Sequence, residues 1–481
     1  YSGVPMLVLT ADRQHELRAS GANQTIDQVK LYGDHALWFY DVALPEAEPP
    51  AVAVRNLRTL AARAIATANG LTRGAVHLNF PFRKPLEPLP VETDITDIAP
   101  YDGPTPFTTI TRGTLHPTAE QVESLHTLIT QSARGLIICG PRATVSSDAL
   151  RRLHQATGYP IFADILSNAR ALPEALTSYD TLLMRDPSFD APDLILHFGA
   201  MPASAALEAY LNRIPTQNRV LISADGMWTD AYHRITHLMH ADPDTLIDAV
   251  CPHISTRPVD TAWVDSVTQA ARMAWLMLQD ALDAELFDGS AVAAAIHSAA
   301  HATHERPLHL FLASSLTVRH AEQYASGENI ARVYSNRGAS GIDGTIASAL
   351  GVAAAHNEAH VLLIIGDLAF YHDLNSLLAV KRGAITNITI VLMNNDGGGI
   401  FRRLPVVDFD PPFTELFLTP HGLDFAPAAR MFGLHYHHPE SLTELREQVR
   451  AAVMTPQPTI IEITTDSQHD LQRRDAINRA V

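Results

Sequence analysis

Two apolar segments in the C-terminal third of the chain each end in side chains that bind metal ions. Asp367 follows the apolar segment 361–365, and Asn395 follows the apolar segment 388–393. If both segments are parallel strands, these side chains lie at carboxyl ends, on the edge where open α/β sheets bind ligands. Carboxylate and amide oxygens, with a backbone carbonyl freed by a nearby glycine, suit Mg²⁺ bridging to phosphates better than zinc. The pattern therefore predicts a metal ion that holds a diphosphate group.

Further motifs surround this pair of residues. They lie at 20–24 (SGANQ), 335–344 (SNRGASGIDG), 366–368 (GDL), 372–375 (HDLN), 397–401 (GGGIF) and 419–425 (TPHGLDF). Gly-Asp followed after a short spacer by Asn-Asn resembles the cofactor motif of the thiamine-diphosphate-dependent enzymes. The full set resembles the 2-succinyl-5-enolpyruvyl-6-hydroxy-3-cyclohexene-1-carboxylate (SEPHCHC) synthase, or MenD, family of menaquinone biosynthesis. The resemblance covers nearly the whole chain.

The expected fold is α/β, because candidate strands alternate with helical segments throughout the chain. With 481 residues the chain is too long for one hydrophobic core. The resemblance implies three doubly wound, Rossmann-like parallel-sheet domains of the thiamine-diphosphate-binding type. We expect half of a pyrimidine-binding domain at 1–95, a central domain of transhydrogenase III-like type at 96–260 and a diphosphate-binding domain at 261–481. A proline-rich segment, 85–108, is expected to be a linker between domains.

Candidate strands are set by short apolar runs and the glycine or polar residues that end them. We expect a turn at 11–13, a helix at about 50–70 and an Ala- and Met-rich helical stretch at about 255–284. The expected strands are 6–10, 75–79, 135–139, 161–164, 194–199, 308–313, 332–335, 361–365, 388–393 and 459–463.

The resemblance assigns the cofactor site residue by residue. Asp367, Asn395 and the carbonyl of Gly397 would bind Mg²⁺ or Mn²⁺, and Leu368 and Gly398 would line the thiamine diphosphate. Ile342 would be the apolar wedge under the bend of the cofactor, with plain core packing as the alternative. Asp396 stands where the family often has asparagine, and its added charge would strengthen ion binding.

The resemblance also implies the substrates, 2-oxoglutarate and isochorismate. Both are polyanions, which arginine recognises well. Residues that match the family's carboxylate binders are Arg13, Asn23, Gln24, Ser315, Arg319 and Arg337, and we expect Gln24, Ser315, Arg319, Arg337 and Ile342 to take part in catalysis. Ile400 and Phe401 would form an apolar wall around the second substrate. A surface salt bridge is the ordinary alternative for any one of these arginines, and core packing is the alternative for the apolar pair.

One position departs from the family pattern. Ala205 stands where a lysine is usual after Pro-x-Ser in the central domain. Alanine cannot pair with a substrate carboxylate, so either another basic residue such as Arg213 compensates or that group binds more weakly.

The glutamate that activates the cofactor in this family would lie ahead of Tyr1, and no residue of this sequence matches it. The chain, which opens on an apolar run at 6–10, is therefore expected to begin within its first domain. Two alternatives remain open: another thiamine-dependent 2-oxoacid decarboxylase or acetohydroxyacid synthase, or a truncated chain that only binds. The segments 20–24 and 419–425 disfavour the first.

Composition excludes several classes of protein. A formal charge of −17 disfavours nucleic acid and anionic membranes as partners. The two cysteines, Cys139 and Cys251, are expected to be structural, and a chain so poor in cysteine fits the cytoplasm. The histidines at 435, 437 and 438 are expected to form a surface or loop cluster rather than a zinc site. The family implies a dimer or a dimer of dimers.

Overall fold

The computed structural model describes residues 2–87, 106–167, 169–184, 189–254, 259–302, 306–383 and 385–481. It divides into two compact units: Tyr1–Leu115 with Asp225–Met227, and His116–Ala224 with Trp228–Val481. Most of the proline-rich segment 85–108 lies outside the described residues.

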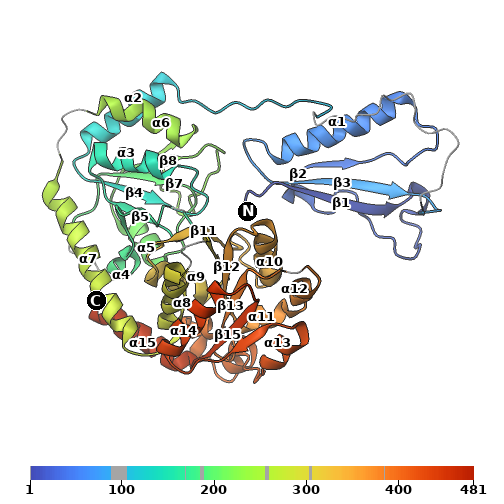
Figure 1. Cartoon of the computed structure of the whole chain (residues 1–481). Helices are drawn as coiled ribbons and strands as arrows, with labels where there is room; N and C mark the ends of the chain where they lie inside the picture. The colour runs from blue at the N-terminus through green and yellow to red at the C-terminus, as the bar shows by residue number, and fades with distance from the viewer. Residues whose placement is uncertain are drawn as a thin grey trace. The chain divides into compact units, whose positions relative to one another are not determined.

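The first unit is a three-stranded parallel sheet with one long helix packed along it (Figure 1). The strands are β1 (Met6–Arg13), β3 (Ala75–Phe82) and β2 (Ala36–Asp41), in that spatial order, and the helix is α1 (Ala51–Ala68); two short 3₁₀ turns, η1 (His15–Leu17) and η2 (Gly33–His35), precede β2. Leu60, Ala64 and Ala68 recur every four residues and pack against Val76 and Leu78 of the central strand.

The turn expected at 11–13 is wrong, because β1 continues to Arg13. Asp12 is buried there and its carboxylate accepts a hydrogen bond from Asn79 of the neighbouring strand. Pairing with β3 along its full length keeps the chain extended where the Ala-Asp-Arg sequence suggested a turn.

The second unit contains two six-stranded parallel sheets. In the first, the spatial order is β6-β5-β4-β7-β8-β9. Its strands are β4 (Gly135–Cys139), β5 (Ile161–Ala163), β6 (Ala175–Leu176), β7 (Leu194–Phe198), β8 (Asn218–Ile222) and β9 (His237–Met239). Its helices are α2 (Ala119–Gln131), α3 (Ser147–Thr157), α4 (Tyr179–Leu183), α5 (Ala205–Arg213), α6 (Pro243–Val250), η3 (Cys251–His253) and α7 (Thr261–Asp283).

The other sheet has the order β11-β10-β12-β13-β15-β14. Its strands are β10 (Leu308–Leu312), β11 (Ile330–Tyr334), β12 (His360–Gly366), β13 (Ile388–Asn394), β14 (His435–His437) and β15 (Thr459–Thr464). The longer helices are α8 (Asp288–Ala302), α9 (Leu316–Tyr324), α10 (Thr345–Ala355), α14 (Leu442–Met454) and α15 (Ser467–Ala480). The shorter ones are α11 (Asp367–His372), η4 (Leu374–Leu377), α12 (Leu378–Gly383), η5 (Gly399–Arg403), η6 (Pro405–Asp408), a π-helical turn η7 (Thr414–Leu418) and α13 (Ala426–Phe432).

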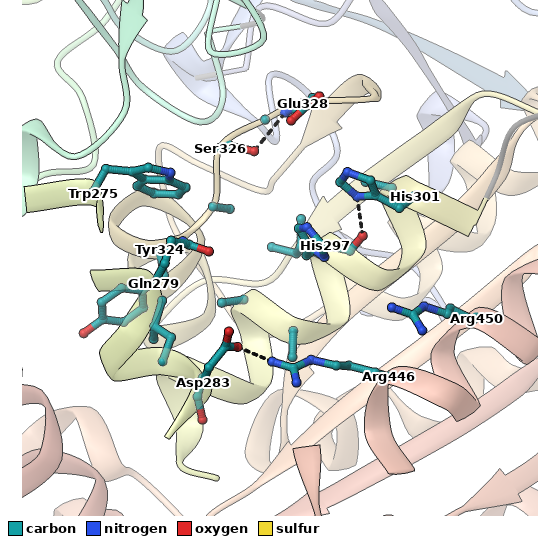
Figure 2. Close-up of a pocket in the computed structure, with 18 residues that line it drawn as sticks. Trp275, Gln279, Asp283, His297, His301, Tyr324, Ser326, Glu328, Arg446 and Arg450 are labelled. Carbon is teal, nitrogen blue, oxygen red and sulfur yellow. Dashed lines mark hydrogen bonds and ion pairs between the residues drawn. The ribbon is translucent and has the colours of Figure 1, made fainter. Parts of the chain in front are cut away.

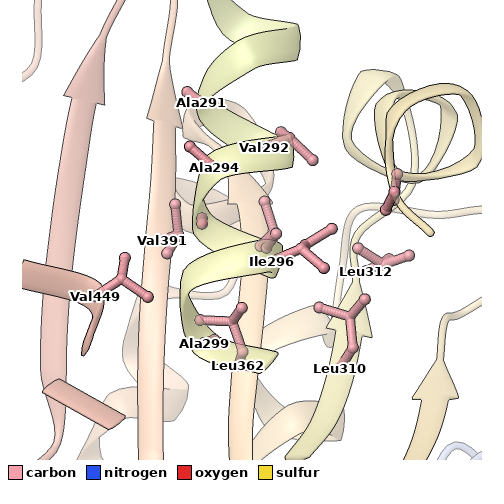
Figure 3. Packing of buried hydrophobic residues seen from close by; sticks show 14 of the residues in the cluster. Ala291, Val292, Ala294, Ile296, Ala299, Leu310, Leu312, Leu362, Val391 and Val449 are labelled. Atoms are coloured by element: carbon pink, nitrogen blue, oxygen red, sulfur yellow. The ribbon is translucent and has the colours of Figure 1, made fainter. Parts of the chain in front are cut away.

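Alternate residues of these strands face opposite sides of the sheet, as the period of two requires. Leu310, Leu362 and Val391 pack against the small side chains of α8, which lies close over β10, β12 and β13 (Figure 3). Phe311, Leu363 and other residues of the opposite face pack under α10 and α13. Because both faces are covered, each central strand reads as an unbroken apolar run.

Three all-parallel sheets with intervening helices confirm the expected α/β class. Among the residues described, no helix is long and apolar enough to cross a membrane.

Candidate cofactor and substrate site

The predicted metal ligands lie at the ends of adjacent strands. Asp367 follows β12 and Asn395 follows β13, and the two strands pair in parallel with Gly366 opposite Met393. On the other side of β12, Ser314 and Ser335 follow β10 and β11. Four consecutive strands therefore bring the main sequence motifs to one carboxyl edge, where such sheets bind ligands.

Asp367 is a buried carboxylate held by backbone amides. Its Oδ1 accepts a hydrogen bond from the N–H of Leu368 at 2.7 Å, and its Oδ2 accepts from the N–H groups of Asn395 at 3.1 Å and Gly397 at 2.9 Å. The side chain is 3% exposed, and this burial raises its pKa. Among the described residues no lysine or arginine pairs with it; the nearest basic atom is Nε2 of His421, at 3.3 Å from Oδ2. A buried carboxylate with so little compensation is stabilised by a bound cation.

The loop after β13 leaves further oxygen atoms available. The Asn395 side chain makes no hydrogen bond to any residue that the structure describes. Gly397 has φ of +132°, and a Cβ atom there would lie 2.0 Å from the carbonyl oxygen of Leu418, so no other residue fits. Its own carbonyl accepts a hydrogen bond from Gly399 at 3.0 Å and retains a second lone pair. The backbone N–H of Gly398 donates to Leu418 at 2.7 Å.

Asp396 has a structural role that the sequence did not reveal. Its Oδ1 accepts hydrogen bonds from the backbone N–H groups of His421 at 2.9 Å and Gly422 at 2.8 Å. These bonds hold the 419–425 motif against the loop that follows β13, and they place the ring of His421 beside Asp367. Donation by these amides lowers the pKa of Asp396, which is therefore a fixed anion at neutral pH.

Ile342 lies in the loop before α10, and its side chain remains 36% exposed. Its carbonyl accepts a hydrogen bond from Thr345 Oγ1 at 3.1 Å, and Gly344 turns the chain with φ of +67°. The side chain is therefore held in an ordered loop and is not part of the buried core.

Ser315 and Arg319 lie at the start of α9, as expected. Arg319 donates from Nη1 to the carbonyl of Ser315 at 2.6 Å. Burial, followed by the nearby charges of Arg337 and Arg403, lowers the pKa of Arg319. No described carboxylate forms an ion pair with Arg319. Guanidinium groups recognise carboxylates and phosphates, so this group of arginines is a candidate site for an anion.

Arg403 was missed by the sequence analysis, although it follows the Ile400-Phe401 motif within η5. In the same neighbourhood, the hydroxyl groups of Ser314 and Ser335 are buried and have no hydrogen-bond partner among the described residues. Buried hydroxyl groups without a partner among the described residues favour a polar ligand nearby.

Ile400 and Phe401 are half-buried on η5. The ring of Phe401 packs edge-on against Phe417, with the centroids 5.6 Å apart. Phe401 therefore contributes to local packing as well as to any wall around a substrate.

Arg13, Asn23 and Gln24 belong to the first unit. Arg13 is the last residue of β1, and the other two are exposed on the following segment, where Gln24 has φ of +55°. The base of this segment is fixed by Arg18, which pairs with Asp12 and with Asp41 at 2.9 Å each. Asn79 donates to both carboxylates at 2.9 Å, and the sequence analysis did not identify this network.

Ala205 is the first residue of α5 and Arg213 is the last. They are therefore separated by about 12 Å along the helix axis, so Arg213 does not replace a lysine locally. Arg403 is a basic residue whose charge reaches this region, because it acts on Asp180. Asp180 accepts a hydrogen bond from Ser204, the residue before Ala205.

The residues at this edge fit a divalent metal ion and the diphosphate of thiamine diphosphate. Asp367, the Asn395 amide and the Gly397 carbonyl supply oxygen ligands. A Cβ atom at Gly366 would meet nothing within 4 Å, so space is open directly beside Asp367.

Comparison with known proteins agrees with this geometry. Residues 315–463 match the family model described as "Thiamine pyrophosphate enzyme, C-terminal TPP binding domain". Residues 105–311 match the one described as "Middle domain of thiamine pyrophosphate". The cofactor of this chain is thus thiamine diphosphate, and the chain is an enzyme.

Individual relatives narrow the family further. A SEPHCHC synthase of Roseiflexus castenholzii is 44% identical over 489 residues, which cover 100% of this chain and 83% of the relative. The Halobacterium salinarum protein of the same name is 39% identical over 494 residues, which cover 98% of this chain and 82% of that protein. The chain belongs to the 2-succinyl-5-enolpyruvyl-6-hydroxy-3-cyclohexene-1-carboxylate synthase family of thiamine-diphosphate-dependent enzymes.

Proposed function

We propose that the chain catalyses the reaction for which these relatives are named. It would decarboxylate 2-oxoglutarate and add the resulting four-carbon unit to isochorismate, which yields SEPHCHC and CO₂. The observation that carries this proposal is the carboxyl edge of one sheet, where, among the described residues, the buried Asp367 has no lysine or arginine partner and Arg319 has no carboxylate partner.

The cofactor residues have distinct tasks. Thiamine diphosphate, when bound, supplies a carbon that accepts the electron pair left by the departing CO₂. Asp367, Asn395 and the Gly397 carbonyl would hold Mg²⁺ or Mn²⁺, while Leu368 and Gly398 would line the diphosphate. Ile342 would press on the cofactor from below and fix its bent shape, because this residue is presented by an ordered loop.

The substrate residues would orient two anions. Arg319 and Arg337 would bind substrate carboxylates as bidentate forks, and Ser315 would donate a hydrogen bond beside them. From the first unit, Arg13, Asn23 and Gln24 would bind the remaining carboxylate and hydroxyl groups. Ile400 and Phe401 would exclude water from the ring of the second substrate.

Assembly, location and domain limits are also part of the proposal. A dimer or dimer of dimers would bring together the pyrimidine-binding and diphosphate-binding parts of different subunits. The cytoplasm is favoured because both cysteines are free thiols. Burial raises the pKa of each thiol, and that of Cys251 rises to about 11. We propose domain limits at about residues 95 and 260. The last strand of the first sheet, β3, ends at Phe82, and α7 begins at Thr261.

The test compares Asp367→Asn with Asp408→Asn, an exposed aspartate on η6. Calorimetry should show that Asp367→Asn weakens binding of thiamine diphosphate in the presence of Mg²⁺ by about tenfold or more, since the buried charge that attracts the metal is gone. Asp408→Asn should bind like the unaltered chain.

Product analysis then tests the substrates. Formation of SEPHCHC from 2-oxoglutarate and isochorismate supports the proposal. Formation of acetolactate from pyruvate, with no product from 2-oxoglutarate, would overturn it.

A further inference from the structure

A second pocket, which the proposed function does not use, lies among the helices that flank the last sheet. Its volume is about 330 Å³, and it is lined by α7, α8, α14 and the segment that follows α9 (Figure 2). Apolar groups such as Trp275, Leu282 and Ala293 form part of the wall. This volume is at the lower end of the range for small-molecule sites.

Four basic side chains surround this pocket. His297 and His301 lie four residues apart on α8, and Arg446 and Arg450 lie four residues apart on α14. That spacing places each pair on one helix face. The imidazole rings stack with centroids 4.1 Å apart, and His301 uses Nδ1 in a hydrogen bond to the carbonyl of His297 at 2.9 Å. Figure 2 shows both pairs directed towards the same hollow.

Two carboxylates, Asp283 and Glu328, line the pocket and equal its two arginines in number, but among the described residues their pairing is incomplete. Asp283 of α7 pairs with Arg446. Within the described part of the chain, Arg450 has no hydrogen bond or ion pair, and the His297 ring has no hydrogen bond. Glu328 lines the pocket from the loop after α9 and, among the residues that the structure describes, forms no ion pair with any of the four bases. Burial, then His301, Arg446 and Arg450, lowers the pKa of His297.

The pocket is separate from the cofactor and substrate site. In this fold the helices run opposite to the strands, so helix C-termini lie at the amino edge of the sheet. His301 is next to the end of α8, which precedes β10; Glu328 directly precedes β11; and Arg450 is near the end of α14, which precedes β15. The basic residues therefore lie towards the edge opposite Asp367.

Stabilisation of helix C-termini is the competing explanation for these bases. It accounts for His301, whose ring bonds a carbonyl of the last turn. It does not account for Arg450, which makes no such bond, or for the cavity that four bases and a tryptophan share.

We propose that this pocket binds a small anion through a carboxylate or phosphate group, between α8 and α14. Arg450 and His297 would supply the main contacts, with Arg446 and His301 beside them. Trp275 would report binding, because it lines the same pocket.

The test titrates the full chain, loaded with thiamine diphosphate and Mg²⁺, with inorganic phosphate and separately with citrate. Tryptophan fluorescence and calorimetry measure binding, and the stronger probe identifies which oxyanion the pocket prefers. We expect Arg450→Gln to weaken binding about tenfold. Arg430→Gln, which changes an exposed arginine on α13, should bind like the unaltered chain.

Failure of both probes to bind, or equal binding by Arg450→Gln and the unaltered chain, would overturn the proposal. None of these outcomes depends on carboligase activity, so the result is independent of the proposed function.

Discussion

Ser315 has a backbone conformation that is costly for a residue with a side chain. Its φ of +73° and ψ of −130° fall in a region that residues other than glycine rarely adopt, at a cost of about 1–3 kcal/mol. The surrounding structure maintains this conformation directly before α9, next to Arg319 and to the unsatisfied hydroxyl of Ser314. Strain of this kind is concentrated at ligand sites, in agreement with the substrate role proposed for Ser315.

Comparing Ser315→Gly with Ser315→Ala separates strain from function. Both changes remove the hydroxyl group and should raise KM for the substrates to a similar extent. Only glycine relieves the backbone strain, so Ser315→Gly should be more stable than Ser315→Ala by about 1 kcal/mol in thermal or urea unfolding. Equal stabilities would show that the positive φ is not strained.

Individual site residues differ in how well the sequence predicts them. Asp367 and Asn395 were predictable because each directly follows an apolar run, which fixes its place at a strand end. Arg403 was not, because its importance depends on its closeness to Arg319 and Asp180, which come from other elements. The role of Asp396 depends on a loop that returns to it after more than twenty residues and is likewise invisible in the local sequence.

At the scale of elements, α4 carries a buried acid. Asp180 accepts a hydrogen bond from Ser204 at the start of α5, and burial raises the pKa of Asp180 to about 6. The folded state therefore holds a proton that the unfolded chain releases above its ordinary pKa of 3.8. Stability is consequently lost as pH rises from about 4 to about 6, and is not regained above that range.

Asp180→Asn should remove this loss, since asparagine still accepts the bond from Ser204 and does not titrate. The stability of the variant relative to the unaltered chain should increase by about 1 kcal/mol between about pH 5 and pH 8. Urea unfolding at the two pH values measures this difference. Asp265→Asn, an exposed change on α7, should show no such pH dependence; a similar increase there would contradict the assignment.

Strands could be predicted where the sequence has a clear apolar segment. The apolar segments at 308–313, 361–365, 388–393 and 459–463 became β10, β12, β13 and β15 within a residue or two. Five strands, β2, β6, β8, β9 and β14, were missed because they are short or mix apolar, aromatic, histidine and polar residues. They form because a neighbouring parallel strand supplies hydrogen bonds, and no local sequence pattern encodes that neighbour.

For the molecule as a whole, a buried ion pair joins the two large sheets of the second unit. Glu322 of α9 accepts hydrogen bonds from Ile165 N–H at 2.6 Å, from the Tyr179 hydroxyl and from Arg170 at 3.5 Å. Arg170 also donates to the carbonyls of Ala163 at 2.8 Å and Ala325 at 2.9 Å. Residues 161–180 belong to the first large sheet, and α9 follows β10 of the other.

Glu322→Gln should destabilise the chain by about 3–5 kcal/mol, because it leaves the Arg170 charge buried without its partner. Differential scanning calorimetry is the suitable measurement, since loss of this contact should also separate one unfolding transition into two. Glu447→Gln, an exposed change on α14, is the matched control. A single transition at an unchanged temperature in Glu322→Gln would show that the pair does not couple the sheets.

The pairing of β12 with β13 sets the precision of the whole carboxyl edge. Gly366 lies opposite Met393, so Asp367 and the Asn395 loop meet without any covalent link between them. A slip of one residue would move the carboxylate by about 3.3 Å and turn it to the other face of the sheet. The packing of buried residues such as Ile364 and Val391 therefore fixes the positions of the proposed metal ligands. Enzyme activity is therefore expected to respond to core substitutions too mild to change the melting temperature.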